Sequence, residues 1–218
     1  MIFDWDYAWK IAPRLAEGLV VTVQATALGM AVALSLGLVL ALARRSRYRL
    51  LAWPTGALVE FVRSTPLLVQ IYFLFYVLPE AGLRFSPLAT GVLALGAHYA
   101  AYCSEVYRAG LESVPRGQWE AAAALNLGRW RTMKDIIIPQ AIPPIVPALG
   151  NYLIAMFKDT PLLSAITVLE VLQVAKLTGA ETFRYVEPLT IVGALFLVLS
   201  LVSAAGIRWV EGRLRLES

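Results

Sequence analysis

The longest run without a charged side chain covers residues 19–43, and it limits what this chain can fold into. As a helix, these 25 residues would be about 37 Å long, which exceeds the ~30 Å hydrocarbon core of a bilayer. An ordinary soluble domain has no core that would cover such a helix on all sides. We therefore interpret the run as a membrane span.

Four further segments are apolar enough to cross a bilayer. They cover about 53–78, 85–104, 141–157 and 188–207, and the third is interrupted by three prolines. The segment 162–175 is apolar but short and carries Glu170, which favours a re-entrant or interfacial helix. With 59% hydrophobic residues, the composition agrees with five spans. We predict an all-α membrane protein with five transmembrane helices in a single domain, residues 1–218.

The basic residues are distributed unevenly between the predicted loops. Twelve of the nineteen fall on one side of the predicted membrane: Arg44, Arg45, Arg47, Arg49, Arg108, Arg116, Arg129, Arg131, Lys134, Arg208, Arg213 and Arg215. Lys and Arg are enriched in cytoplasmic loops, and five spans place the termini on opposite sides. We predict a multi-pass protein of the cell inner membrane with its N-terminus outside and its C-terminus in the cytoplasm. This topology explains the net charge of +4 without a nucleic-acid partner.

The start of the chain and its single cysteine carry further expectations. Asp4 and Asp6 stand where a signal peptide would carry Lys or Arg, so we expect no cleavable signal. Because Cys103 is the one cysteine, the chain has no intrachain disulfide, and no metal-ligand spacing is present. The isolated His98 is interpreted as a packed, hydrogen-bonded residue rather than a proton relay.

A short alanine-rich helix is predicted in the cytoplasmic loop 115–139. Residues 118–125 favour a helix, with Glu120 in the first turn, where the helix dipole favours a carboxylate. Ala121 and Ala122 would let another surface approach closely, and Trp119 offers a large anchor. The composition suits a docking site for a soluble partner.

The end of this helix is also marked in the sequence. Asn126 tolerates the left-handed conformation that ends a helix, and Gly128 acts as a second breaker. Residues 129–138 then resume as a basic helix, which Pro139 is expected to stop.

The loop resembles the EAA loop of the permease subunits of ABC importers. That pattern is Glu-Ala-Ala, three residues, Gly, and then Ile and Pro some ten residues on; the matching residues are Glu120, Ala121, Ala122, Ile136 and Pro139. Asn126 replaces the usual Gly, and we expect the turn to survive. Residues 63–70, 105–110 and 158–163 resemble the polar amino acid branch, so the likeness covers nearly the whole chain. Within the branch, the chain looks most like ectoine and hydroxyectoine permease subunits.

This resemblance implies the type I ABC importer permease fold and a set of partners. They are an ATP-binding-cassette ATPase dimer docked on the EAA helices, an extracellular or periplasmic substrate-binding protein, the surrounding lipid, and a second permease subunit. The second subunit would be a paralogue or an identical copy. The chain has no Gly-x-x-x-x-Gly-Lys-Ser/Thr phosphate loop, so ATP and Mg²⁺ are expected on the separate ATPase and no cofactor on this chain.

Two similar segments are candidates for lining a substrate pathway. Each has a cation followed by Thr-Pro-Leu-Leu, which gives the candidates Arg63, Thr65 and Pro66 in one segment and Lys158, Asp159 and Thr160 in the other. A proline frees a backbone carbonyl, and such backbone is tolerated at membrane depth where protein or a cavity covers it. The alternatives are that Arg63 only pairs with Glu60, and that Lys158 and Asp159 form an outer-surface ion pair.

Two more polar residues are pathway candidates. Glu170 lies with Thr167 and Gln173 on a predicted helix after Pro161, as a counter-charge for a cationic substrate group or as part of the wet face of an interfacial helix. Gln70 is either an interhelical hydrogen-bonding residue or a pathway residue.

Two alternatives to a transport function are an intramembrane enzyme and a non-transporting scaffold protein. An intramembrane enzyme would need a His-Glu-x-x-His, paired-Asp or Ser-His arrangement, which the spans lack. A non-transporting scaffold would leave the prolines and charges of 141–159 without a purpose. In 19–43, the row Gly29, Ala33, Gly37 indicates close helix packing, either within the chain or between subunits.

Overall fold

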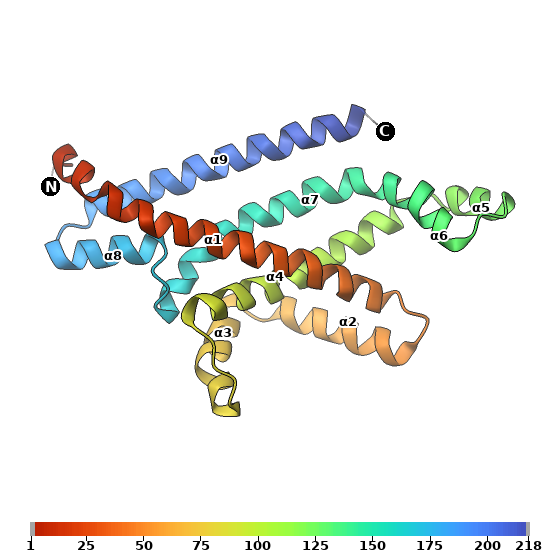
Figure 1. Ribbon diagram of the computed structural model, residues 1–218, viewed down its shortest axis with the longest axis horizontal. Helices are drawn as coiled ribbons and strands as arrows, with labels where there is room; N and C mark the ends of the chain where they lie inside the picture. Colours follow the sequence, from red (N-terminus) through yellow and green to blue (C-terminus); the bar gives the residue numbers. More distant parts are fainter. Residues whose placement is uncertain (1–2, 217–218) are drawn as a thin grey trace.

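The computed structural model describes residues 3–216, and this part of the chain is helical with no strand (Figure 1). Met1, Ile2, Glu217 and Ser218 lie outside the described residues. The elements are α1 (Trp5–Arg44), α2 (Arg49–Ser64), α3 (Leu67–Tyr72), η1 (Phe73–Val77), η2 (Leu78–Ala81), α4 (Pro87–Glu112), α5 (Arg116–Ala124), α6 (Arg129–Arg131), η3 (Thr132–Ile137), α7 (Ile138–Asp159), η4 (Thr160–Ile166), α8 (Val171–Thr182) and α9 (Val186–Leu216).

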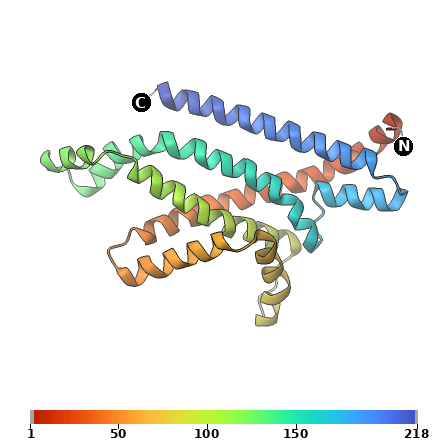
Figure 2. The same ribbon diagram turned by 180° about the vertical axis from the view of Figure 1, so that it is seen from behind.

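The long helices lie side by side, and their connections gather at two ends. Figures 1 and 2 show the α1–α2 connection, the α5–α6 segment and the described end of α9 toward one end of the molecule. The N-terminal turn, α8 and the α8–α9 corner lie at the other end. The three arginine-rich segments of the sequence therefore share one end, which agrees with a common side of the membrane.

Within residues 3–216, three stretches are long and apolar enough to span a membrane: Trp5–Arg44, Arg129–Ile166 and Val186–Leu214. A fourth, Arg49–Ala81, qualifies only as a bent pair of helices. The predicted span 85–104 corresponds to α4, which is less apolar. Its polar side chains are tolerated because α4 packs against α1, α2, α3 and α7, so protein covers it. The count of five spans stays a prediction.

Two predicted boundaries are wrong. Segment 53–78 is not one helix, because the chain breaks at Thr65–Pro66 and bends by 106°. Pro139 does not stop the basic helix, because it directly follows a π-type turn whose wider hydrogen-bond spacing accommodates a residue without an N–H. The helix instead continues from Arg129 to Ile166 through a wide π-type turn at Thr132–Ile137.

Small residues set the contact between α1 and α4. Gly29, Ala33 and Gly37 are buried on one face of α1. A Cβ on Gly37 would lie 2.8 Å from the Cβ of Cys103 and 2.9 Å from the carbonyl oxygen of Ala100. The row therefore packs within the chain, and α4 covers the face that subunit dimerisation would need.

We predict that Gly37→Ala destabilises the protein, because its new methyl group would contact the backbone of α4. The expected loss is roughly 1–3 kcal/mol, measured as thermal unfolding in detergent. Gly193→Ala is the matched control: no atom lies within 4 Å of its added Cβ. Since alanine favours a helix by about 1 kcal/mol over glycine, the control should hold or gain stability. Equal midpoints for the two variants would contradict the packing argument.

Candidate translocation site and coupling loop

The break between α2 and α3 is held by side chains. Pro66 has no N–H, so the carbonyl of Val62, four residues earlier, loses its helical donor. The Nε2 of Gln70 replaces that donor, at 2.8 Å from the Val62 oxygen, and also donates to the Thr65 hydroxyl at 2.7 Å. Thr65 in turn donates to the carbonyl of Phe61 at 3.0 Å. The bend is thus a satisfied structure rather than a disrupted helix.

Gln70 also joins this break to α4. Its Oε1 lies 3.1 Å from Nδ1 of His98. This contact confirms the interpretation of Gln70 as an interhelical hydrogen-bonding residue and of His98 as a packed, hydrogen-bonded one.

An aromatic cluster continues from His98 along α4 to α7. The rings of Tyr99 and Tyr102 lie 6.2 Å apart, and Tyr152 of α7 lies 6.1 Å from the first and 5.5 Å from the second. The Tyr99 hydroxyl donates to Oδ2 of Asp159 at 2.7 Å. Sequence reasoning missed these tyrosines, although the spacing 98, 99, 102 of polar aromatics in an uncharged span was a usable signal.

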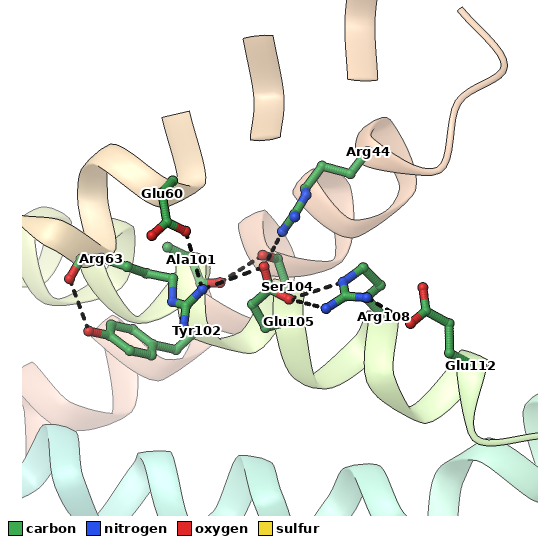
Figure 3. A network of polar contacts seen from close by, with 9 residues as sticks. All are labelled: Arg44, Glu60, Arg63, Ala101, Tyr102, Ser104, Glu105, Arg108 and Glu112. Carbon is green, nitrogen blue, oxygen red and sulfur yellow. Dashed lines mark hydrogen bonds and ion pairs between the residues drawn. The ribbon is translucent and has the colours of Figure 1, made fainter. Parts of the chain in front are cut away.

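Arg63 borders this cluster with its hydrogen-bonding capacity unused. Its guanidinium lies 5.4 Å from the centre of the Tyr102 ring, 3.6 Å from Glu60 and 3.7 Å from Glu105 (Figure 3). Both ion contacts are longer than a hydrogen bond. The guanidinium of Arg63 donates no hydrogen bond to any described residue. The alternative of an exclusive pair with Glu60 is not what the structure shows.

Glu105 cannot neutralise Arg63 because two other arginines hold it. Figure 3 shows Arg44 of α1 and Arg108 of α4 converging on its carboxylate. Arg108 donates to Oε2 from Nε at 3.0 Å and from a terminal nitrogen at 2.7 Å. Arg63 is therefore a half-exposed cation with free donors, beside a wall of tyrosines.

The second similar segment contributes one residue to this site. Asp159 reaches the cluster through Tyr99. No ion pair joins Lys158 to Asp159 in the described chain; Lys158 instead borders a hollow of about 380 Å³ against α9, with Phe196 and Ser200. Thr160 is buried and donates to the carbonyl of Phe157 at 2.8 Å.

The predicted polar stripe of Thr167, Glu170 and Gln173 does not exist. Helix α8 begins only at Val171, and Thr167 is a left-handed residue with φ 63° that ends η4. Glu170 is fully buried and caps α8, accepting from the amides of Leu172 at 2.9 Å and Gln173 at 2.7 Å. Both carboxylate oxygens are used by backbone, so the wet-face interpretation is wrong and the pathway role loses its geometric basis.

The predicted loop 115–139, named the coupling loop from here on, folds as the sequence predicts at its turn. Asn126 has φ 53°, and its amide donates to the carbonyl of Ala123 at 3.0 Å, while Leu127 donates to Ala122 at 3.0 Å. These two bonds form a Schellman motif, which here accepts Asn in place of Gly. Gly128, between α5 and α6, has an extended backbone and precedes the first turn of α6.

The two faces of the loop helix α5 have different surroundings. Ala122 is buried, and Trp119 and Ile136 pack with Val114, Ile137 and Ala141 in a small core where α5 meets η3 and α7. Glu120 and Ala121 are exposed, and the Glu120 carboxylate has no partner among the described residues. One face of α5 thus holds to α7, and the other is open.

Comparison with known proteins identifies this architecture. Residues 33–216 match the family model of the binding-protein-dependent transport system inner membrane component. The chain belongs to this family.

The similar proteins are permeases, and the match covers nearly all of each chain. The chain is 48% identical to a probable amino-acid ABC transporter permease of Sinorhizobium fredii, over 96% of this chain and 94% of that one. It is 33% identical to the glutamine transport system permease GlnP of Escherichia coli, over 99% of this chain and all of that one. A solved amino acid ABC transporter with histidines superposes with a TM-score of 0.92, at 33% identity, over 98% of this chain and all of that chain. The type I importer permease fold is thereby confirmed.

We predict that Gln70→Leu destabilises the permease by roughly 1–3 kcal/mol, because it removes the 2.8 Å hydrogen bond to the Val62 carbonyl and the contact with Nδ1 of His98. Pro66→Ala restores an amide that can donate to Val62, so it should recover part of the loss in the Gln70→Leu background. Gln140→Leu is the control, since this exposed residue donates to the Ile136 carbonyl one turn earlier and to the exposed side chain of Gln118, and joins nothing to the bend. Thermal unfolding of Gln70→Leu, Pro66→Ala, the double variant and Gln140→Leu is the measurement, and additive effects in the double variant would contradict the assignment.

Proposed function

We propose that the chain is the permease subunit of an ATP-driven importer for polar amino acids in the cell inner membrane. The observation that carries this proposal is the guanidinium of Arg63, which has free donors beside the tyrosine cluster in the membrane-embedded part of the chain. The names of the similar permeases, for amino acids and for glutamine, support the same substrate class.

The two ends of the tyrosine cluster suit the two charges of an amino acid. Arg63 lies against Tyr102 and would bind a carboxylate in the bidentate manner of arginine. Asp159 lies against Tyr99 and would attract an ammonium or another cationic group. Thr65, Pro66 and Gln70 hold the backbone bend that positions Arg63. Ectoine and hydroxyectoine also combine a carboxylate with a cationic group, so they are the finer candidates that the sequence resemblance suggests.

The coupling loop would connect this site to the ATPase. The open face of α5, with Glu120 and Ala121, would receive a cytoplasmic ATPase subunit that binds ATP and Mg²⁺. Its other face packs on η3 and α7 through Trp119, and the helix from Arg129 continues to Ile166, past Asp159. A movement of α5 would therefore reach Asp159 through one helix, which is the lever needed for alternating access.

The remaining assignments follow from the charge distribution and the family. We place the arginine-rich end in the cytoplasm and the N-terminal end outside. The family is described as part of a binding-protein-dependent transport system, which implies a binding protein. This protein would approach from the outside. A second permease subunit, paralogous or identical, would complete the pore.

We predict that Arg63→Gln raises the KM for uptake at least tenfold, because the substrate carboxylate loses its arginine. Proteoliposomes with the complete transporter would be supplied with polar amino acids, their carboxamide analogues, and ectoines. Wild type should prefer the free carboxylate, and Arg63→Gln should lose that preference. Arg49→Gln, which changes an exposed arginine at the other end of α2, should keep it. A retained preference in Arg63→Gln would contradict the site, and absence of all uptake by wild type would contradict the function.

We predict that Glu120→Lys reduces uptake and substrate-stimulated ATP hydrolysis at least tenfold without loss of membrane insertion, since it reverses the charge on the open face of α5. Asp135→Lys is the matched control, because Asp135 is an exposed carboxylate of the same loop within η3. Pull-down of the ATPase by the permease gives the direct measurement. Equal ATPase binding by both variants and wild type would argue against this face.

A further inference from the structure

A groove lies between α1 and α2, which run side by side in opposite directions from their shared connection (Figures 1 and 2). Its volume is about 770 Å³, within the range of roughly 300–1,000 Å³ that is usual for ligand sites. The residues that line it are Arg44, Arg49, Ala52, Trp53, Gly56, Ala57 and Glu60. Neither the translocation site nor the coupling loop gives this groove a role.

The connection beside the groove carries positive charge that the chain does not neutralise. Residues 44–49 contain four arginines and no acidic residue. Arg44 is the one of the four that forms an ion pair with a described residue, Glu105. Arg47 donates to the hydroxyl of Tyr48, and Arg49 is exposed and pairs with no described residue. The counter-charge that Arg49 lacks would be an anionic group in the groove.

The floor of the groove is apolar and open. It consists of the small residues Ala52, Gly56 and Ala57 on α2. A Cβ added to Gly56 would lie within 4 Å of one atom, the Nε of Arg44, at 3.8 Å. Trp53 borders the groove and is 80% exposed, as suits an indole at the boundary between a membrane and water. A cation above an apolar floor fits an amphiphilic ligand better than a free anion.

The groove also has the polarity of a phospholipid in a bilayer. Arg44 is the first charged residue after the uncharged run 19–43, so this end lies where a span meets the headgroups. Glu60 lies at the other end, about 16 Å along α2 from Arg49, and faces Arg63 at 3.6 Å. An anionic headgroup therefore belongs at the Arg49 end, with its chains directed toward the middle of the membrane.

We propose that this groove binds an anionic phospholipid, with the phosphate on Arg49 and an acyl chain over Ala52, Gly56 and Ala57. An arginine can donate two parallel N–H groups to one phosphate. A lipid is favoured over a soluble protein because the groove combines an unpaired cation with an apolar floor and opens beside a membrane span. The proposed topology places the site in the cytoplasmic leaflet. The inference goes beyond the transport function and does not depend on the substrate.

The first test measures lipid binding by native mass spectrometry of the complete transporter, titrated in detergent with phosphatidylglycerol. Arg49→Gln should raise the half-saturating concentration of the tightest-bound lipid roughly tenfold or more, because the phosphate loses a charge-assisted contact. Arg45→Gln is the matched control, since Arg45 is exposed in the same connection and does not line the groove. It should raise that concentration by no more than about fivefold, through the general surface attraction. Equal effects of the two variants would overturn the proposal.

The second test fills the groove without changing a charge. Gly56→Leu places a side chain over the apolar floor, and it should also weaken phosphatidylglycerol binding roughly tenfold. Gly193→Leu is the control, because open space surrounds Gly193 as well, on α9; it should leave binding unchanged. Unchanged binding in Gly56→Leu would overturn the proposal. Release of the second permease subunit by Gly56→Leu, visible in the same spectra, would also overturn it, because the groove would then be a subunit interface.

Two competitors identify the ligand. Phosphatidylcholine should bind more weakly than phosphatidylglycerol in wild type, and soluble glycerol 3-phosphate should not displace the lipid. Equal binding of both lipids, or displacement by glycerol 3-phosphate, would overturn an anionic lipid site. Arg49→Gln should still keep the preference of uptake for free carboxylates, since that preference belongs to Arg63. A failure of the proposed function is therefore distinguishable from a failure of the lipid site.

Discussion

Every element of the candidate site is fixed to α4, and α4 is fixed by its close contact with α1. Glycine at position 37 leaves room for the carbonyl of Ala100 within van der Waals distance, so the two backbones meet with little side chain between them. Two helices this close cannot slide without collision, and α4 becomes a fixed support. Tyr99, Tyr102, His98 and Glu105 lie on that support. The bend at Pro66 and the long helix through α7 are positioned against it.

The two groups of polar side chains in the membrane region, at the bend and around Glu105, differ in how far their hydrogen-bonding groups are satisfied. At the bend, each freed backbone group finds a side-chain partner, and Gln70 provides most of them. Around Glu105, three arginines share one carboxylate, and Arg63 receives only its long contact. Polar groups inside a membrane are costly unless they are satisfied. The unsatisfied donors of Arg63 therefore stand out, because the same region satisfies its neighbours so completely.

Sequence reasoning succeeded where one local rule decides the structure. The uncharged run 19–43 required a span, the arginines gathered at one end, and Asn126 took the left-handed turn that its side chain tolerates. It failed where two rules compete. Proline often ends a helix, and the sequence predicted this for Pro139. Here the helix continues, because Pro139 follows a π-type turn that accommodates its missing N–H. The spacing of Thr167, Glu170 and Gln173 suggested one helical face, whereas a carboxylate just before a helix is also a cap. The clustering of Tyr99, Tyr102 and Tyr152 depends on how α4 and α7 meet, which no local pattern encodes.

The long helix that would carry motion from α5 to Asp159 does not have the same stiffness along its length. Pro143, Pro144 and Pro147 remove three backbone hydrogen bonds from the half of α7 nearer the coupling loop, and the π-type turn at Thr132–Ile137 interrupts the regular α-helical bonding before them. The half that ends at Asp159 has no proline inside it. The part of the helix nearer α5 is therefore the easier one to bend. The part that touches the tyrosine cluster would move as one rigid segment.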